Sequence, residues 1–179
     1  MQEIEKTYLI KAIPDGLAEC GREEIWDIYF PKSTMHPKSR LRKIGDSFEI
    51  TKKERNYDTA SVQDEHTISL EQEEFEALSQ IEGKELRKLR YYYDHDGRTS
   101  EVDVYLNAFE GLVTADFEFE TREELDSFKL PSFCLADVSE EDFIAAGLLA
   151  GKSYADIETE LAKYDYHPLK IPENLKQSG

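Results

Sequence analysis

The chain has 179 residues, and its 39 acidic and 22 basic side chains give a formal net charge of −17. This charge repels nucleic acids and anionic membranes unless a local basic patch overrides it, and it favours cations. The length suffices for a domain with its own hydrophobic core, and we expect a single domain over residues 1–179.

Cysteine content and apolar runs bear on the cellular compartment. Cys20 and Cys134 are far apart and form no CxxC pair, so neither a disulfide framework nor a zinc site is indicated. The N-terminus lacks a basic region followed by an apolar stretch, and nowhere do about 18 apolar residues follow one another. We therefore expect a cytoplasmic protein without a membrane partner.

Alternation of polar and apolar residues predicts short strands along most of the chain. In chain order these cover residues 3–11, 40–45, 47–54, 66–70, 85–93, 99–106 and 112–120. Gly45 and Asp46 predict a hairpin, and the last three strands predict an antiparallel meander. Helices are expected at residues 17–20, at 71–81 and from Ser139 onward.

The polar faces of these strands are sorted by charge sign. Successive side chains of a strand point to opposite sides, so residues two apart share a face. Acidic pairs or triplets occur at Glu3 and Glu5, at Glu101 and Asp103, and at Asp116, Glu118 and Glu120. The basic set comprises Arg40, Arg42, Lys52, Lys88 and Arg90.

Two explanations fit this sorting. Exposed cross-strand ion pairs are one, but each contributes only about 0 to 1 kcal/mol, which gives stability little reason to favour so many. A ligand is the other: arginine and lysine bind the oxygens of a triphosphate, while clustered carboxylates hold Mg²⁺ or Mn²⁺. The second explanation accounts for both signs in one cavity.

Six segments carry a resemblance to a known family. They are EIE at 3–5, RLR at 40–42, the Lys52 strand, KLR at 88–90, EVDVY at 101–105 and GLVTADFEFE at 111–120. In this order they resemble the CYTH superfamily, the triphosphate tunnel metalloenzymes. The resemblance implies an α+β fold, in which an eight-stranded antiparallel β-barrel closes into a charged tunnel with helices packed outside.

The resemblance also implies an activity, namely hydrolysis of a triphosphate with Mg²⁺ or Mn²⁺. Inorganic triphosphate is the expected substrate, because no base-reading element is evident. By analogy, Arg40, Arg42, Lys52, Lys88 and Arg90 would bind phosphate, and Glu3, Glu5, Asp116, Glu118 and Glu120 would hold metal. Two alternatives stay open: an adenylyl cyclase that makes cyclic AMP from ATP, and a phosphate-binding module without turnover. A homodimer is compatible with each.

The first motif departs from the family pattern ExExK, whose lysine shares a face with the two glutamates. Here Thr7 takes the place of that lysine, and Lys6 belongs to the other face. Lys11 has the right parity but lies about 13 Å further along the strand. The departure leaves the catalytic residue unassigned and motivates the hypothesis of a module without turnover.

Overall fold

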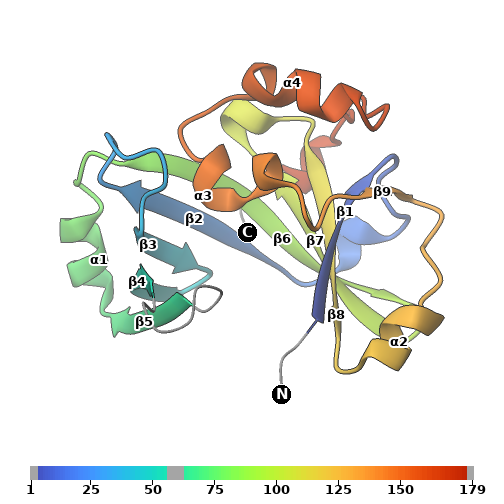
Figure 1. Cartoon of the computed structure of the whole chain (residues 1–179), viewed down its shortest axis with the longest axis horizontal. Helices are drawn as coiled ribbons and strands as arrows, with labels where there is room; N and C mark the ends of the chain where they lie inside the picture. Colours follow the sequence, from blue (N-terminus) through green and yellow to red (C-terminus); the bar gives the residue numbers. More distant parts are fainter. Residues whose placement is uncertain (1–3, 56–62, 177–179) are drawn as a thin grey trace. The chain divides into compact units, whose positions relative to one another are not determined.

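The computed structural model describes residues 4–55 and 63–176 (Figure 1). The strands in these residues are β1 (Ile4–Ile10), β2 (Arg22–Phe30), β3 (Ser39–Ile44), β4 (Ser47–Arg55), β5 (Gln63–Leu70), β6 (Lys84–His95), β7 (Arg98–Tyr105), β8 (Val113–Phe119) and β9 (Cys134–Asp137). The α-helices are α1 (Gln72–Leu78), α2 (Arg122–Ser127), α3 (Ala146–Leu149) and α4 (Tyr154–Ala162). Short 3₁₀ helices are η1 (Leu17–Glu19), η2 (Asn107–Phe109), η3 (Asp142–Ile144) and η4 (Glu173–Leu175).

The strands form one sheet with the order β5-β4-β3-β2-β6-β7-β8-β1-β9. Within the described residues β5 and β9 are its edges, so the sheet is open and the predicted closed eight-stranded barrel is wrong. Alternation predicts the face on which a side chain lies, and this pattern is the same for an open sheet and for a barrel. Closure depends on pairing between the two edge strands, which alternation does not encode.

The predicted meander is confirmed. Strands β6, β7 and β8 pair antiparallel, with Arg90 opposite Asp103 and Glu101 opposite Asp116. The predicted hairpin about Gly45 is confirmed as the β3–β4 pair. The strands β2 and β9 were not predicted.

The helical segment expected from Ser139 onward is broken into η3, α3 and α4. Ser139 does not begin an α-helix, and its hydroxyl instead accepts a hydrogen bond from the Thr7 N–H at 3.0 Å. Ser153 and Asp156 form the capping box that begins α4. None of the helices in residues 4–55 and 63–176 is long and apolar enough to cross a membrane.

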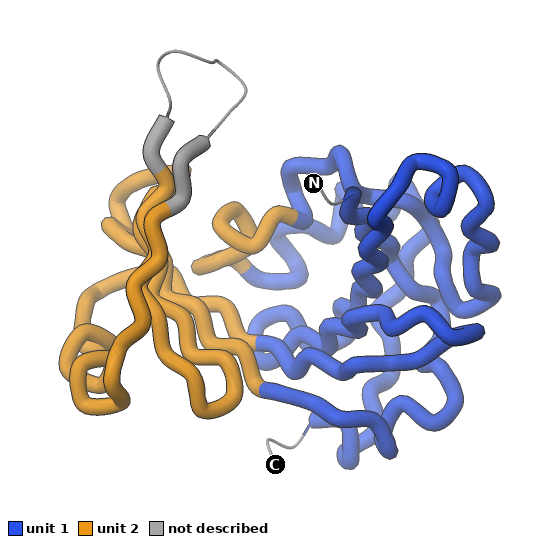
Figure 2. Tube along the Cα trace, turned by 90° about the horizontal axis from the view of Figure 1, so that it is seen from below, with its two compact units in different colours: residues 1–23, 88–144, 153–179 blue, residues 24–87, 145–152 orange. Residues whose placement is uncertain are grey.

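The chain divides into two compact units (Figure 2). Unit 1 comprises residues 1–23, 88–144 and 153–179, and unit 2 comprises residues 24–87 and 145–152. A single domain over residues 1–179 stays a prediction.

The core of unit 1 covers the apolar face of β1, β6, β7 and β8. Phe117 and Phe119 of β8 are buried there, as their alternation predicts. Phe128, just after α2, packs on both, with ring centroids 4.9 and 5.1 Å away. Every second residue of these strands therefore points to the opposite face.

The core of unit 2 lies between α1 and strands β2 to β4. Phe75 of α1 packs on Trp26 of β2 and on Phe48 of β4, with ring centroids 5.6 and 5.1 Å apart. A capping box of Glu71 and Glu74 begins α1, which agrees with the helix predicted in this segment. The packing assigns one face of β2, β3 and β4 to the core and leaves the other to polar groups.

Tyr166 anchors the segment that follows α4 to the beginning of β8. Its buried hydroxyl donates to the Gly111 carbonyl at 2.8 Å and accepts from the Val113 N–H at 2.9 Å. Gly111 has φ +97°, and a Cβ there would lie 2.8 Å from Pro168, so this contact requires glycine. The hydroxyl thus satisfies two buried backbone groups.

We expect Tyr166→Phe to lower the free energy of unfolding by about 1–3 kcal/mol, because it removes the buried partner of the Val113 N–H. Tyr164→Phe is the matched control, since its hydroxyl bonds the half-buried Glu141 side chain and should cost less than about 1 kcal/mol. Urea unfolding of both variants measures the difference. Equal losses would show that the buried hydroxyl has no special role.

Candidate functional site

The charged face of unit 1 is formed by β1, β6, β7 and β8. Register places Asp116 of β8 opposite both Glu101 of β7 and Thr7 of β1. Glu118 lies opposite Glu5 in the same way. Directly opposed residues of an antiparallel pair share a face, so these side chains gather on the side away from the core.

Asp103 compensates two cations at the centre of this face. It is only 1% exposed, and it accepts from Arg90 Nε on Oδ1 and from Arg90 Nη2 on Oδ2, both at 2.8 Å. Lys88 Nζ donates to Oδ2 as well. Burial alone would raise the pKa of Asp103, but the charges and hydrogen bonds of Lys88 and Arg90 outweigh it and lower the pKa. Asp103 is therefore ionised and holds both phosphate-binding candidates.

Asp116 has a different environment, although it is only 8% exposed. Burial, reinforced by the negative charge of Asp103, raises its pKa to about 7, while Lys88 and Thr7 act in the opposite direction. Its Oδ2 is 3.5 Å from Arg90 Nη2, and its buried Oδ1 has no hydrogen-bond partner among the described residues. An unpartnered, buried carboxylate oxygen is costly to stability and suits a divalent cation.

The other predicted metal ligands are more exposed. Glu5 and Glu118 are exposed and oppose each other beside the Thr7–Asp116 pair, whereas Glu3 lies outside the described residues. Across residues 4–55 and 63–176, no three carboxylate, imidazole or thiol side chains are grouped closely enough to hold a metal ion. The buried Oδ1 of Asp116 is the feature of this face that fits such an ion.

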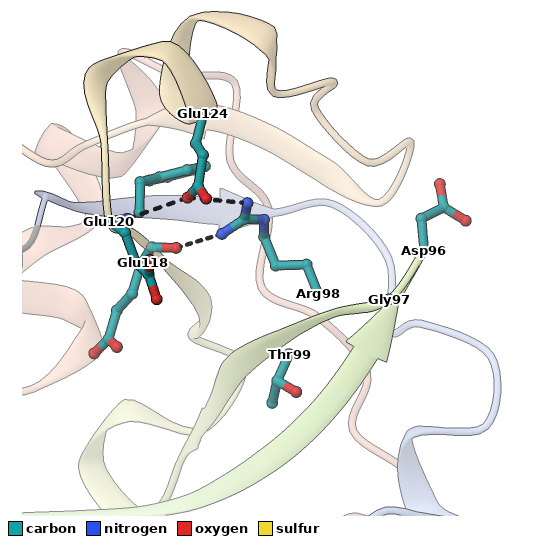
Figure 3. A pocket seen from close by; sticks show the side chains of 8 residues that line it. Asp96, Gly97, Arg98, Thr99, Glu118, Glu120 and Glu124 are labelled. Atoms are coloured by element: carbon teal, nitrogen blue, oxygen red, sulfur yellow. Dashed lines mark hydrogen bonds and ion pairs between the residues drawn. The ribbon is translucent and has the colours of Figure 1, made fainter.

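Glu118 and Glu120 also line a pocket of about 460 Å³ (Figure 3). Arg98 crosses it, donating to the Glu118 carbonyl at 2.6 Å and to the Glu124 carboxylate at 3.4 Å. The Glu120 N–H also donates to Glu124, at 3.1 Å. Asp116 does not line this pocket, so the structure groups Glu120 with Arg98 and Glu124.

Unit 2 has its own charged face on β2, β3 and β4. Asp27 of β2, also 1% exposed, accepts from Arg42 Nε at 2.7 Å and from Arg42 Nη2 at 2.8 Å. Arg40 Nη2 donates to Glu49 at 3.0 Å and approaches Thr51 Oγ1 at 3.4 Å. Arg40 Nε is buried without a partner among the described residues. The two predicted arginines therefore share one face and are paired with acids.

The two lysines of β4 lie on different faces. Register places Arg40 opposite Thr51 and Ser39 opposite Lys52. By alternation, Lys53 shares the face of Thr51 and the arginines, while Lys52 shares the face of Ile50. The role of Lys52 in phosphate binding stays a prediction, and Lys53 is an additional candidate.

Sequence reasoning missed Asp27, Tyr29 and Lys53. Tyr29 lies opposite Arg40, and its hydroxyl is 3.5 Å from Asp27 Oδ2. Burial and the negative charge of Asp27 raise the pKa of Tyr29. The spacing of Asp27 and Tyr29 by two residues was the available signal, but it lies in the strand that was not predicted.

Thr7 shares the charged face of unit 1 because it lies opposite Asp116. Lys6 points to the other side and donates to Asp137 at 3.0 Å. The position of the ExExK lysine is therefore occupied by a neutral hydroxyl.

The antiparallel strands of this chain carry apolar side chains on one face and paired acids and arginines on the other. The chain resembles the CYTH superfamily of triphosphate tunnel metalloenzymes. It is similar to the inorganic triphosphatase of Nitrosomonas europaea, at 27% identity over 143 residues that cover 79% of this chain and 91% of that protein. No family model matches the sequence.

Two crystal structures are similar in fold. That of the hypothetical protein NE1496 aligns with a TM-score of 0.69 at 26% identity, over 85% of this chain and 99% of the other. That of the inorganic triphosphatase NE1496 aligns with a TM-score of 0.67 at 24% identity, over 85% and 96%.

We expect Asp116→Asn to stabilise the protein at pH 8 by about 2–4 kcal/mol and to have almost no effect at pH 4. The pKa of Asp116 is about 7 in the folded protein and near 3.8 in the unfolded chain. The buried carboxyl is therefore neutral at pH 4 and costs little, whereas above pH 7 it is ionised and lowers the free energy of unfolding. Urea unfolding at several pH values measures this difference. A stabilisation of equal size at both pH values would contradict it.

Proposed function

We propose that the chain is a divalent-metal-dependent triphosphatase whose substrate is inorganic triphosphate. Two findings support the proposal: a relative named inorganic triphosphatase, similar over 79% of the chain, and the buried cluster of Lys88, Arg90 and Asp103 beside Asp116. Of these, the cluster carries the chemical argument, because it fixes cations next to an unsatisfied carboxylate oxygen.

The cations are assigned to phosphate binding. On the charged face of unit 1, Lys88 and Arg90 would bind phosphate oxygens. On that of unit 2, Arg40 and Arg42 would do so, with either Lys52 or Lys53. Their acid partners hold them in place before substrate arrives, so little reorganisation accompanies binding. Such preorganised positive charge is the main contribution a protein makes to phosphoryl transfer.

The carboxylates are assigned to the metal. Asp116 would be the central ligand, with Glu5 and Glu118 on neighbouring strands, and Glu3 and Glu120 would complete the set. When bound, a divalent ion neutralises phosphate charge and acts as a Lewis acid. Water attacks the terminal phosphorus, the bond from that phosphorus to the bridging oxygen breaks, and phosphate and diphosphate leave.

Thr7 motivates a second function, a triphosphate-binding module without turnover. A threonine hydroxyl cannot supply the positive charge that a lysine would bring opposite Asp116. We favour the enzyme, because Asp116 is buried beside Lys88 and Arg90, and a divalent ion held there would supply the positive charge that Thr7 lacks.

The test is phosphate release from inorganic triphosphate, ATP and thiamine triphosphate, with Mg²⁺, with Mn²⁺ and with EDTA. We expect release to require the metal and to be fastest with inorganic triphosphate. Glu118→Ala should need more metal for half-maximal activity, and Lys163→Ala, an exposed residue paired with Glu160, is the control. Binding of triphosphate without release would favour the module, and cyclic AMP formation from ATP would favour the cyclase.

The lysines of β4 provide a separate prediction. We expect Lys53→Ala to raise the KM for triphosphate about tenfold, which is roughly 1.4 kcal/mol and typical of one charge-assisted hydrogen bond. Lys52→Ala, on the other face of the same strand, should change it less than about threefold. Steady-state kinetics of the two variants separate the assignments, and the opposite ranking would restore Lys52 as the phosphate ligand.

A further inference from the structure

We propose that Asp27 is a positioning residue that orients Arg42 for binding a phosphate group. The inference rests on the proposed function, since the phosphate group is that of a triphosphate. Asp27 itself is not expected to touch the substrate.

The geometry of the pair leaves one edge of Arg42 available. Asp27 and Arg42 are direct partners across β2 and β3, and both carboxylate oxygens accept from the edge formed by Nε and Nη2. A guanidinium is planar, so Nη1 and the second hydrogen of Nη2 point away from the carboxylate. These donors are the ones that a phosphate oxygen can reach.

Burial separates the roles of the two partners. The Asp27 side chain is 1% exposed, whereas that of Arg42 is 20% exposed. The guanidinium is therefore the member of the pair that a ligand can reach, and Glu49, which pairs with Arg40, is its neighbour on β4. The bidentate contact also engages both Asp27 oxygens, which makes this residue a poor metal ligand.

Stability does not explain the pair by itself. A buried ion pair is often no more stabilising than apolar residues of similar size, because desolvation offsets the attraction. Holding a long, flexible side chain in one conformation before binding does reduce the entropy that a ligand must overcome. A pair of this kind is therefore more useful to recognition than to folding.

The same arrangement occurs independently in unit 1. Arg90 and Asp103 are direct partners across β6 and β7, with the same Nε–Oδ1 and Nη2–Oδ2 contacts and an aspartate that is also 1% exposed. In both units the arginine belongs to the predicted phosphate-binding set and the aspartate is the buried member. Two occurrences on different strand pairs indicate a shared purpose, the orientation of arginine.

A double-mutant cycle tests the proposal with Asp27→Asn, Arg42→Ala and the double variant. The readouts are the triphosphate Kd from calorimetry in EDTA and the KM and kcat for phosphate release with Mg²⁺. We expect Asp27→Asn to raise Kd and KM about tenfold and to leave kcat within about threefold. In the Arg42→Ala background the Asp27 substitution should have no further effect, because Asp27 acts through Arg42.

Two further variants distinguish a loss of triphosphate binding from a loss of folding. Asp27→Glu keeps the charge but displaces the carboxylate by one methylene, so it should fold and still raise Kd, even if Asp27→Asn does not fold. Glu85→Gln, which removes a carboxylate that accepts from Trp26 Nε1 at 3.1 Å in the same unit, should leave Kd unchanged. Thermal unfolding of every variant accompanies the binding measurements.

The outcomes distinguish the two proposals. If wild type binds triphosphate but releases no phosphate, the triphosphatase is rejected, while a weaker Kd for the Asp27 variants still supports positioning. Wild-type affinity in both Asp27 variants, or an equal loss with and without Arg42, would overturn the inference. A wild type that neither binds nor hydrolyses triphosphate overturns both.

Discussion

Burial of Asp103 between Lys88 and Arg90 is the interaction on which the charged face of unit 1 depends. Two cations inside a sheet are tolerated only if a nearby anion compensates their lost hydration. Because Lys88 and Arg90 are paired with Asp103, they compensate Asp116 only in part, and the charge of Asp103 disfavours ionisation of this neighbouring carboxyl. One pairing thus creates both the fixed cations and the unsatisfied acid that a metal and a phosphate would stabilise.

Much of this charged face could be predicted from the sequence, because successive side chains of a strand point to opposite faces of the sheet. Alternation correctly separated Phe117 and Phe119 from Asp116 and Glu118, and turn residues located the meander. Closure could not be predicted in this way, because it depends on whether the distant edges β5 and β9 pair. The strand β2 was missed for a different reason: Asp27 interrupts its apolar run, and only a cross-strand arginine makes its burial acceptable.

The sequence predicted which site residues are acidic and which are basic, but it did not predict which acid pairs with which base. The sequence identified Asp103 only as one of an acidic pair with Glu101, and the structure shows that it pairs with Lys88 and Arg90. The lysines of β4 illustrate the same difficulty, since a shift of one residue exchanges the faces of Lys52 and Lys53. Which acid meets which base is a property of strand pairing, and single-strand patterns carry no information on it.

Thr7 and Asp116 show how the departure from the family motif changes the chemistry of this face. A lysine opposite Asp116 would add a positive charge close to the carboxyl and lower its pKa. With threonine there, burial and the charge of Asp103 dominate, and the pKa stays near 7. A divalent ion that displaced this proton would supply the positive charge that a lysine would bring, so metal binding at this carboxylate would matter more than it would beside a lysine.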